Sequence, residues 1–84
     1  MEKEKPVIAR IKRLIMESVP YEPGRSTNGD TLYGNVSSYC DELGFMLTDR
    51  VFRDAIIELH KEQCIVRFSD KDIRPTQYGL NRYG

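Results

Sequence analysis

The stretch LTDRVFRDAIIELHKE, residues 47–62, combines a helix-capping residue, one apolar stripe and two arginines outside that stripe. Thr48 can accept a hydrogen bond from a free backbone N–H and so begin a helix. The apolar side chains recur at three- and four-residue spacing, which is typical of a helix that buries one face: Val51, Phe52, Ala55, Ile56 and Leu59. We therefore predict a helix from Thr48 to Glu62 that packs this stripe on the core.

The opposite face of this predicted helix is the candidate functional surface. It carries Arg50, Arg53, Asp54 and Ile57. Two arginines near the start of a helix are placed to enter the major groove of DNA or to grip phosphates. An ordinary solvated face is the alternative, because charge on a helix exterior is the usual case. Ile57 favours a surface that something covers, although single exposed apolar residues are common.

After this helix the pattern changes from helical to extended. Residues 63–68 alternate as a strand does, and residues 77–82 alternate again. Between them, residues 69–76 form a polar loop that carries Lys71 and Arg74. Two strands around a charged loop behind a helix form a β-hairpin wing. The side chains expected on one side of the first strand are Cys64, Val66 and Phe68.

The beginning of the chain predicts a first helix and a loop. Residues 1–5 are interpreted as a frayed, solvated start, and Pro6 suits the first turn of a helix that runs to about Ser18. Residues 20–30 contain Pro-Gly and Asn-Gly turn signals, so we expect an exposed loop there.

A second helix is expected after this loop. Asp30 or Thr31 can cap its start, and Gly44 ends it as a left-handed residue does. A short segment then leads to Thr48. Two helices joined by a short turn, the second with a basic outer face, form a helix-turn-helix arrangement.

The composition limits the functions that this chain can have. Its 84 residues suit one small domain, and no apolar run is long enough to cross a bilayer. The start lacks the apolar segment of a signal peptide, so we expect a cytoplasmic protein. The formal net charge is zero, with 13 basic and 13 acidic residues, which counts against a strongly electrostatic nucleic-acid binder. That argument depends on where the charges lie on the folded surface.

Neither catalysis nor metal binding has a strong candidate in the sequence. The single histidine, His60, lies among charges on an outward helix face, and no glycine-rich phosphate loop is present. Cys40, His60 and Cys64 with Asp41 are a conceivable metal set, but zinc sites usually show closer ligand pairs. Two buried, reduced thiols are the preferred interpretation of the cysteines. We therefore expect no enzymatic activity, no cofactor and no metal.

Together these pieces resemble a winged-helix domain, and most of all the C-terminal winged helix of archaeal replication initiators of the origin-recognition type. The similarity covers roughly the last fifty residues and rests on residues 32–44, 47–54 and 56–66. The family usually has glycine where Gln63 stands, so the chain reversal here uses a residue that tolerates a left-handed conformation less well. The resemblance implies an α+β fold, a winged helix-turn-helix with three helices and a C-terminal two-stranded β-hairpin wing, in one domain over residues 1–84.

Two functions follow as alternatives. The first is binding of double-stranded DNA in transcriptional regulation or replication control, which the resemblance also implies. Its contacts are expected from Thr48, Arg50, Arg53, Asp54, Ile57, Lys71 and Arg74. The second is protein–protein interaction without DNA, which the zero net charge and the acids of the predicted wing favour. Many winged helices act as dimers, so a homodimer is a further expectation, and we expect no membrane partner.

Overall fold

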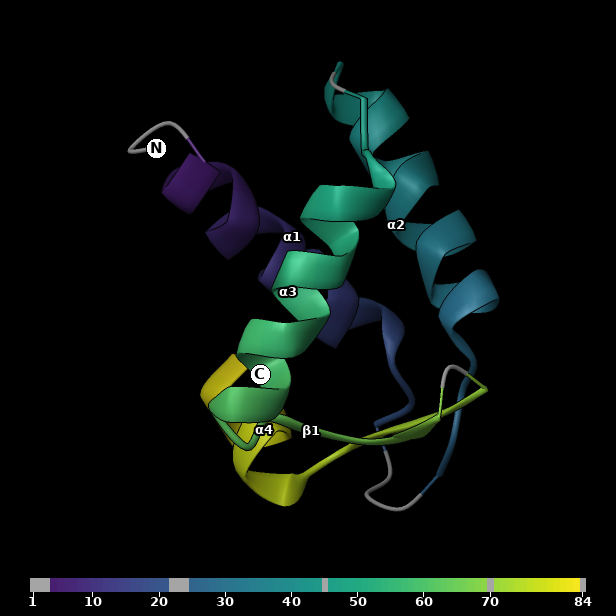
Figure 1. Ribbon diagram of the computed structural model, residues 1–84, viewed down its shortest axis with the longest axis vertical. Coiled ribbons are helices and arrows are strands. Elements are labelled where there is room, and N and C mark those ends of the chain that lie inside the picture. The colour runs from purple at the N-terminus through teal and green to yellow at the C-terminus, as the bar shows by residue number, and fades with distance from the viewer. Residues whose placement is uncertain (1–3, 22–24, 45, 70, 84) are drawn as a thin grey trace.

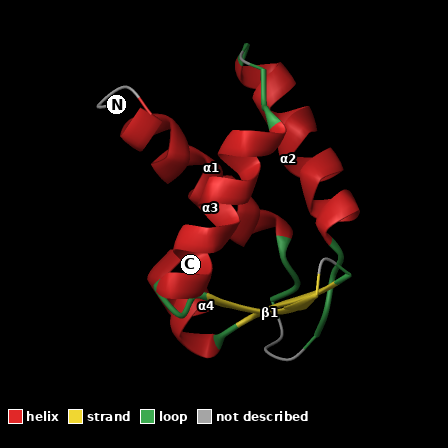
Figure 2. Cartoon of the chain, viewed as in Figure 1, coloured by secondary structure: helices red, strands yellow, loops and turns green. Residues whose placement is uncertain are grey.

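The computed structural model describes residues 4–21, 25–44, 46–69 and 71–83. In chain order its elements are α1 (Glu4–Ser18), α2 (Gly29–Leu43), α3 (Asp49–Lys61), β1 (Ile65–Ser69), β2 (Asp72–Pro75) and α4 (Gln77–Tyr83) (Figures 1 and 2). This part of the chain is an α+β arrangement of four helices, with a two-stranded antiparallel hairpin after α3. The layout is compatible with a winged-helix-like fold. Among the described residues, no helix is both long enough and apolar enough to cross a membrane.

Helix α3 packs against α1, and α2 also packs against α1. Figure 1 shows α3 crossing α1, while the hairpin runs from the end of α3 toward the start of α2. The predicted stripe of α3 does face the core: Ala55, Ile56 and Leu59 are buried, and Val51 and Phe52 are half-buried. The other elements contribute buried side chains that include Ile11, Ile15, Leu32, Val36, Ile65 and Ile73. The outward face of α3 is therefore the face opposite this core.

The boundaries of α3 and of the turn before it agree with the prediction. The Thr48 hydroxyl accepts a hydrogen bond from the Val51 amide at 3.3 Å, so Thr48 is the N-cap. Gly44 ends α2 with a φ of 82°, in the left-handed region that favours glycine. These two residues fix the turn that leads from α2 into α3.

The start of α2 differs from the prediction. Asn28, not Asp30 or Thr31, is the N-cap, because its side-chain oxygen accepts a hydrogen bond from the Thr31 amide at 2.7 Å. The helix therefore begins at Gly29, and the loop predicted over residues 20–30 is shorter than expected. At the other end of the chain, α1 already includes residues 4 and 5 of the expected frayed start. Residues 1–3 and 22–24 lie outside the described residues.

The second strand and the end of the chain also correct the prediction. Residues 72–75, expected in a polar loop, form β2. Residues 77–82, expected as the second strand, lie in the short helix α4, which extends to Tyr83. Ile73 is buried within β2. Nothing in the sequence indicates this strand, because Ile73 stands alone between the charged residues Asp72 and Arg74. Thr76 then starts a helix, because its hydroxyl accepts a hydrogen bond from the Gly79 amide at 3.0 Å. The hairpin is therefore internal, and the expected count of three helices is too low.

The hairpin is paired on both sides of β2. Val66 lies opposite Arg74 and Arg67 opposite Ile73, with an irregularity in the register after Arg67. On its other side, Ile73 exchanges two backbone hydrogen bonds with Thr27, each 2.8 Å long. The segment before α2 is thus bonded to the hairpin, and this contact positions the hairpin beside α2 and α3.

A partly buried ion pair joins the first helix to the end of the third. The Lys12 ammonium donates a hydrogen bond to Glu62 Oε2 at 2.8 Å and lies 3.9 Å from Glu58 Oε1. Burial disfavours the charge on Lys12, but the hydrogen bond to Glu62 and the surrounding charges outweigh it and raise the pKa of Lys12. The pair therefore holds α1 against the C-terminal end of α3.

Candidate functional site

The outward face of α3 presents the predicted arginines to solvent. Arg50 and Arg53 are both exposed, and within the described part of the chain neither forms an ion pair or a hydrogen bond through its side chain. Ile57 is also exposed, at 38%, whereas Asp54 on the same face is half-buried. Two guanidinium groups are thus available for an external partner, with one apolar side chain further along the same helix.

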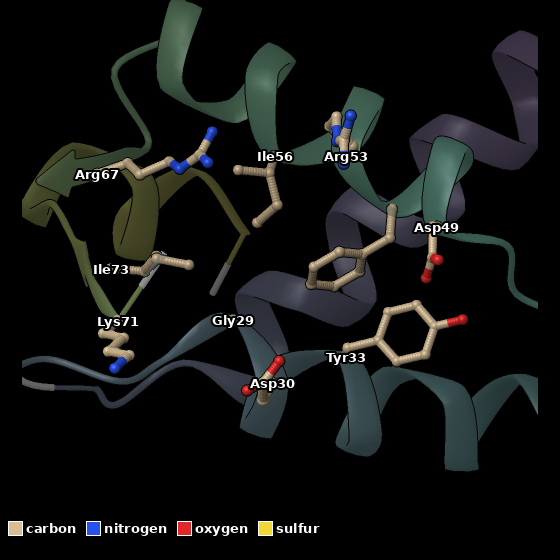
Figure 3. A pocket seen from close by; sticks show the side chains of 10 residues that line it. Gly29, Asp30, Tyr33, Asp49, Arg53, Ile56, Arg67, Lys71 and Ile73 are labelled. Carbon is tan, nitrogen blue, oxygen red and sulfur yellow. The ribbon is translucent and has the colours of Figure 1, made fainter. Parts of the chain in front are cut away.

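A groove of about 480 Å³ separates this helix from the hairpin. Three elements or their ends form it: the start of α2, the first half of α3 and the hairpin. Figure 3 shows the groove from close by, with the lining residues Gly29, Asp30, Tyr33, Asp49, Phe52, Arg53, Ile56, Arg67, Lys71 and Ile73. Arg53 and Lys71, predicted from separate segments, therefore line one groove, and the hairpin end lies on the same flank as this arginine.

The electrostatic character of the groove is mixed. Arg53, Arg67 and Lys71 line it, and so do Asp30 and Asp49. The acids lie on α2 and at the start of α3, whereas two of the three cations come from the hairpin. A polyanion that approaches from the hairpin side would meet cations first.

Tyr33 and Phe52 give the groove a fixed apolar wall. Their rings pack edge to face, with centroids 5.2 Å apart and an interplanar angle of 77°. The Tyr33 hydroxyl donates a hydrogen bond to the Leu47 carbonyl at 3.2 Å, which ties α2 to the turn before α3. Burial raises the pKa of Tyr33, and the nearby Asp49 carboxylate raises it further. Tyr33 thus stays a neutral donor and helps to position the start of α3.

Arg74 is placed differently from the other predicted cations. Its guanidinium forms two hydrogen bonds with the Asp72 carboxylate, from Nε at 2.9 Å and from NH2 at 3.2 Å. These bonds lower the pKa of Asp72. The same guanidinium lies over the Phe68 ring, 5.1 Å from its centroid. Arg74 is therefore engaged within the hairpin and does not line the groove that holds Arg53 and Lys71.

Sequence reasoning missed residues that lie beside the predicted ones, among them Arg67 and Phe68. Arg67 lines the groove, and a second cleft next to it is lined by His60, Arg67, Phe68 and Ser69. Alternation in β1 predicted Phe68 on the side of Cys64, but Phe68 is 68% exposed. The reason is that β1 extends past the core: its burial falls from the buried Ile65 to the exposed Arg67, Phe68 and Ser69. No signal within residues 63–68 marks where the core ends.

The described residues hold no group of three or more His, Cys, Asp and Glu side chains arranged to bind a metal. Cys40 and Cys64 are both buried free thiols, as predicted. Burial raises the pKa of both thiols, which disfavours the reactive thiolate. The conceivable metal set of the sequence is therefore not assembled in the described part of the chain.

The surface that remains as the candidate site is the exposed arginine face of α3 together with the adjoining side of the hairpin. Thr48 lies at the start of this face, and its hydroxyl is already used as the N-cap. Comparison of the chain with family models, with curated proteins and with solved structures finds no match.

Proposed function

We propose that this chain is a winged-helix domain that binds double-stranded DNA, with α3 in the major groove and the hairpin on the neighbouring backbone. One observation carries the proposal: Arg53 of α3 and Lys71 of the hairpin line the same groove, and the nearby Arg50 is exposed and has no side-chain partner among the described residues. Cations from two elements on one flank suit a ligand whose charges are spread over a long surface.

The dimensions of α3 suit this role. Its 13 residues make a helix of about 20 Å, and the major groove admits an α-helix. Arg50 and Arg53 would supply hydrogen bonds to base edges or phosphates. A bidentate contact from arginine to guanine is worth about 1–3 kcal/mol of base discrimination. Asp54 and Ile57 would complete the contact face.

The remaining contacts would fix orientation more than sequence. The backbone amides at the start of α3, next to Thr48, are suited to hold a phosphate. Lys71 would reach the flanking backbone or the minor groove. Arg74 would contribute only if DNA competes with Asp72 for its guanidinium, because that group is already bonded. The zero net charge of the chain is compatible with this scheme, because binding depends on the charges of the contact face and not on the net charge of the whole chain. Transcriptional regulation or replication control is the role proposed.

The test is titration of a labelled duplex with the R50A/R53A double variant at two salt concentrations. The two arginines together should contribute about 2 kcal/mol or more, so the variant should bind at least about thirtyfold more weakly. Its affinity should also depend less steeply on salt, by about one unit of slope for each phosphate that the variant no longer neutralises.

The matched control is R10A/R13A, which removes two exposed arginines at the same spacing from α1. It changes the net charge equally but leaves the α3 face intact, so its affinity should stay within a few-fold of the unmodified protein. Equal losses in the two double variants would reject α3 as the contact face.

The alternative of a protein-binding winged helix rests on Ile57, which is 38% exposed on the proposed contact face. A purified protein that does not bind duplex DNA even at low salt would favour this alternative over the DNA proposal.

A further inference from the structure

Phe68 is an aromatic side chain at the outer end of β1, and 68% of it is exposed. A single exposed apolar residue needs no explanation by itself. The surroundings of Phe68 are unusual, however, because charged side chains border it. Arg74 lies over the ring, and His60 and Arg67 line the cleft beside it. An exposed ring that a guanidinium group covers on one face suits a partner with a flat apolar surface.

The ring is also held in place before any partner arrives. The Arg74 guanidinium, 5.1 Å from the ring centroid, covers one face of the ring. Arg74 is itself fixed by two hydrogen bonds to Asp72, so the contact does not depend on a freely rotating side chain. Phe68 also lines a cleft of about 480 Å³. Such bracing reduces the entropy that binding would otherwise cost.

We infer that Phe68 is a wedge that inserts between two base pairs from the minor groove of the DNA that α3 binds. This inference rests on the proposed function. With α3 in the major groove, the adjoining hairpin would face the neighbouring minor groove. Apolar side chains inserted there separate stacked bases and bend the duplex. Arg74 would keep its bonds to Asp72 and brace the ring, while Lys71 at the hairpin end would face the phosphates beside that groove.

The test uses a short duplex rich in TA steps, which are the easiest to unstack. The fluorescent base 2-aminopurine replaces adenine at these steps, and a dye at each end reports bending by energy transfer. Binding of the unmodified protein should raise the 2-aminopurine fluorescence severalfold and bring the ends closer. F68A should still bind through α3 but should lose both signals, whereas F68L, which keeps an apolar wedge, should retain them.

The matched control is Y39A, which removes an exposed aromatic ring from α2, 44% exposed and outside the groove. It should keep both signals. Binding without a fluorescence or energy-transfer change, or equal signals in F68A and the unmodified protein, would overturn the wedge and leave the proposed function intact. Loss of both signals in F68L would also overturn it, and so would a response confined to single-stranded DNA. No duplex binding at any salt concentration would remove the proposed function and the wedge together.

Discussion

Gln63 carries the clearest backbone strain in the described part of the chain. Its φ of 62° lies in the left-handed region, and it is the only described residue other than glycine with a positive φ. The Cβ of an L-residue crowds the following carbonyl oxygen there, at a cost of roughly 1–2 kcal/mol. Gln63 makes the sharp reversal between α3 and β1, and its carbonyl accepts a hydrogen bond from the Thr76 hydroxyl at 2.6 Å. This reversal confirms the expectation drawn from the sequence at this position.

Replacement of Gln63 by glycine should therefore stabilise the protein. Glycine removes the steric cost but adds about 0.5–1 kcal/mol of chain entropy, so a net gain of up to about 1 kcal/mol is expected. Urea unfolding followed by circular dichroism would measure it. Q63A is the control, because alanine keeps the Cβ and should bring no comparable gain. A stability of Q63G at or below that of the unmodified protein would contradict the strain argument.

At the scale of elements, local signals were readable in the sequence and long-range ones were not. The caps at Thr48 and Gly44 each depend on a single residue type in a local context, so the sequence predicted them. The reversal at Gln63 was expected from the resemblance to the winged-helix family, which usually has glycine there. The place of β2 depends on Ile73 meeting Thr27 and the core, which no local window contains. For the same reason the sequence predicted the arginines of α3 as a surface but missed Arg67, whose place in the groove comes from the pairing of the hairpin.

Helix α4 gives a sharp test of packing, because Gly79 lies directly against the backbone of Cys64. A Cβ on Gly79 would come within 2.7 Å of the Cys64 Cα and would overlap the Cys64 carbonyl oxygen. Backbone cannot move aside as a flexible side chain can, so G79A should cost about 1–3 kcal/mol. The matched control is G34A in α2, where the added Cβ has no neighbour within 4 Å. There alanine should stabilise by about 0.5–1 kcal/mol.

Thermal melting of the two alanine variants gives the comparison directly. Opposite shifts in the melting temperature are expected, downward for G79A and upward for G34A. If G79A melted at or above the temperature of the unmodified protein, the packing of α4 on the start of the hairpin would be looser than described.

At the scale of the whole molecule, the Lys12–Glu62 pair links parts of the chain that are far apart in sequence. Glu62 Oε2 accepts from Lys12, whereas Glu62 Oε1 is buried without a hydrogen-bond partner among the described residues. Removal of the ammonium would take away the hydrogen-bonded partner of this partly buried carboxylate and leave Arg82 to stabilise its charge. K12M should therefore lower the free energy of unfolding by about 1–3 kcal/mol at neutral pH.

The pair also gives stability a defined dependence on pH. The pKa of Lys12 is raised above its ordinary value of 10.5, so the folded state holds this proton more tightly than the unfolded chain does. Its contribution is complete below that ordinary value and is lost as pH rises through the higher folded value. Urea unfolding between about pH 9 and 12 should therefore show the difference between the unmodified protein and K12M becoming smaller.

Comparison with K12M is needed because other groups also make stability depend on pH in alkali. Burial raises the pKa of Tyr33, Tyr83, Cys40 and Cys64, so the unmodified protein should lose stability there for several reasons at once. Only the pH-dependent loss of stability that is absent in K12M can be assigned to Lys12. A difference that stays constant across this pH range would show that the pair contributes through packing and not through charge.

The bonds between Thr27 and Ile73 have a consequence for how this molecule meets a target. They anchor the hairpin to the segment before α2, so the hairpin cannot swing as a hinged arm without breaking them. The distance between the arginine face and the Phe68 ring is therefore fixed once the chain has folded. A target has to present its contact points at that distance or change its own shape to do so, because the protein does not change shape to meet it.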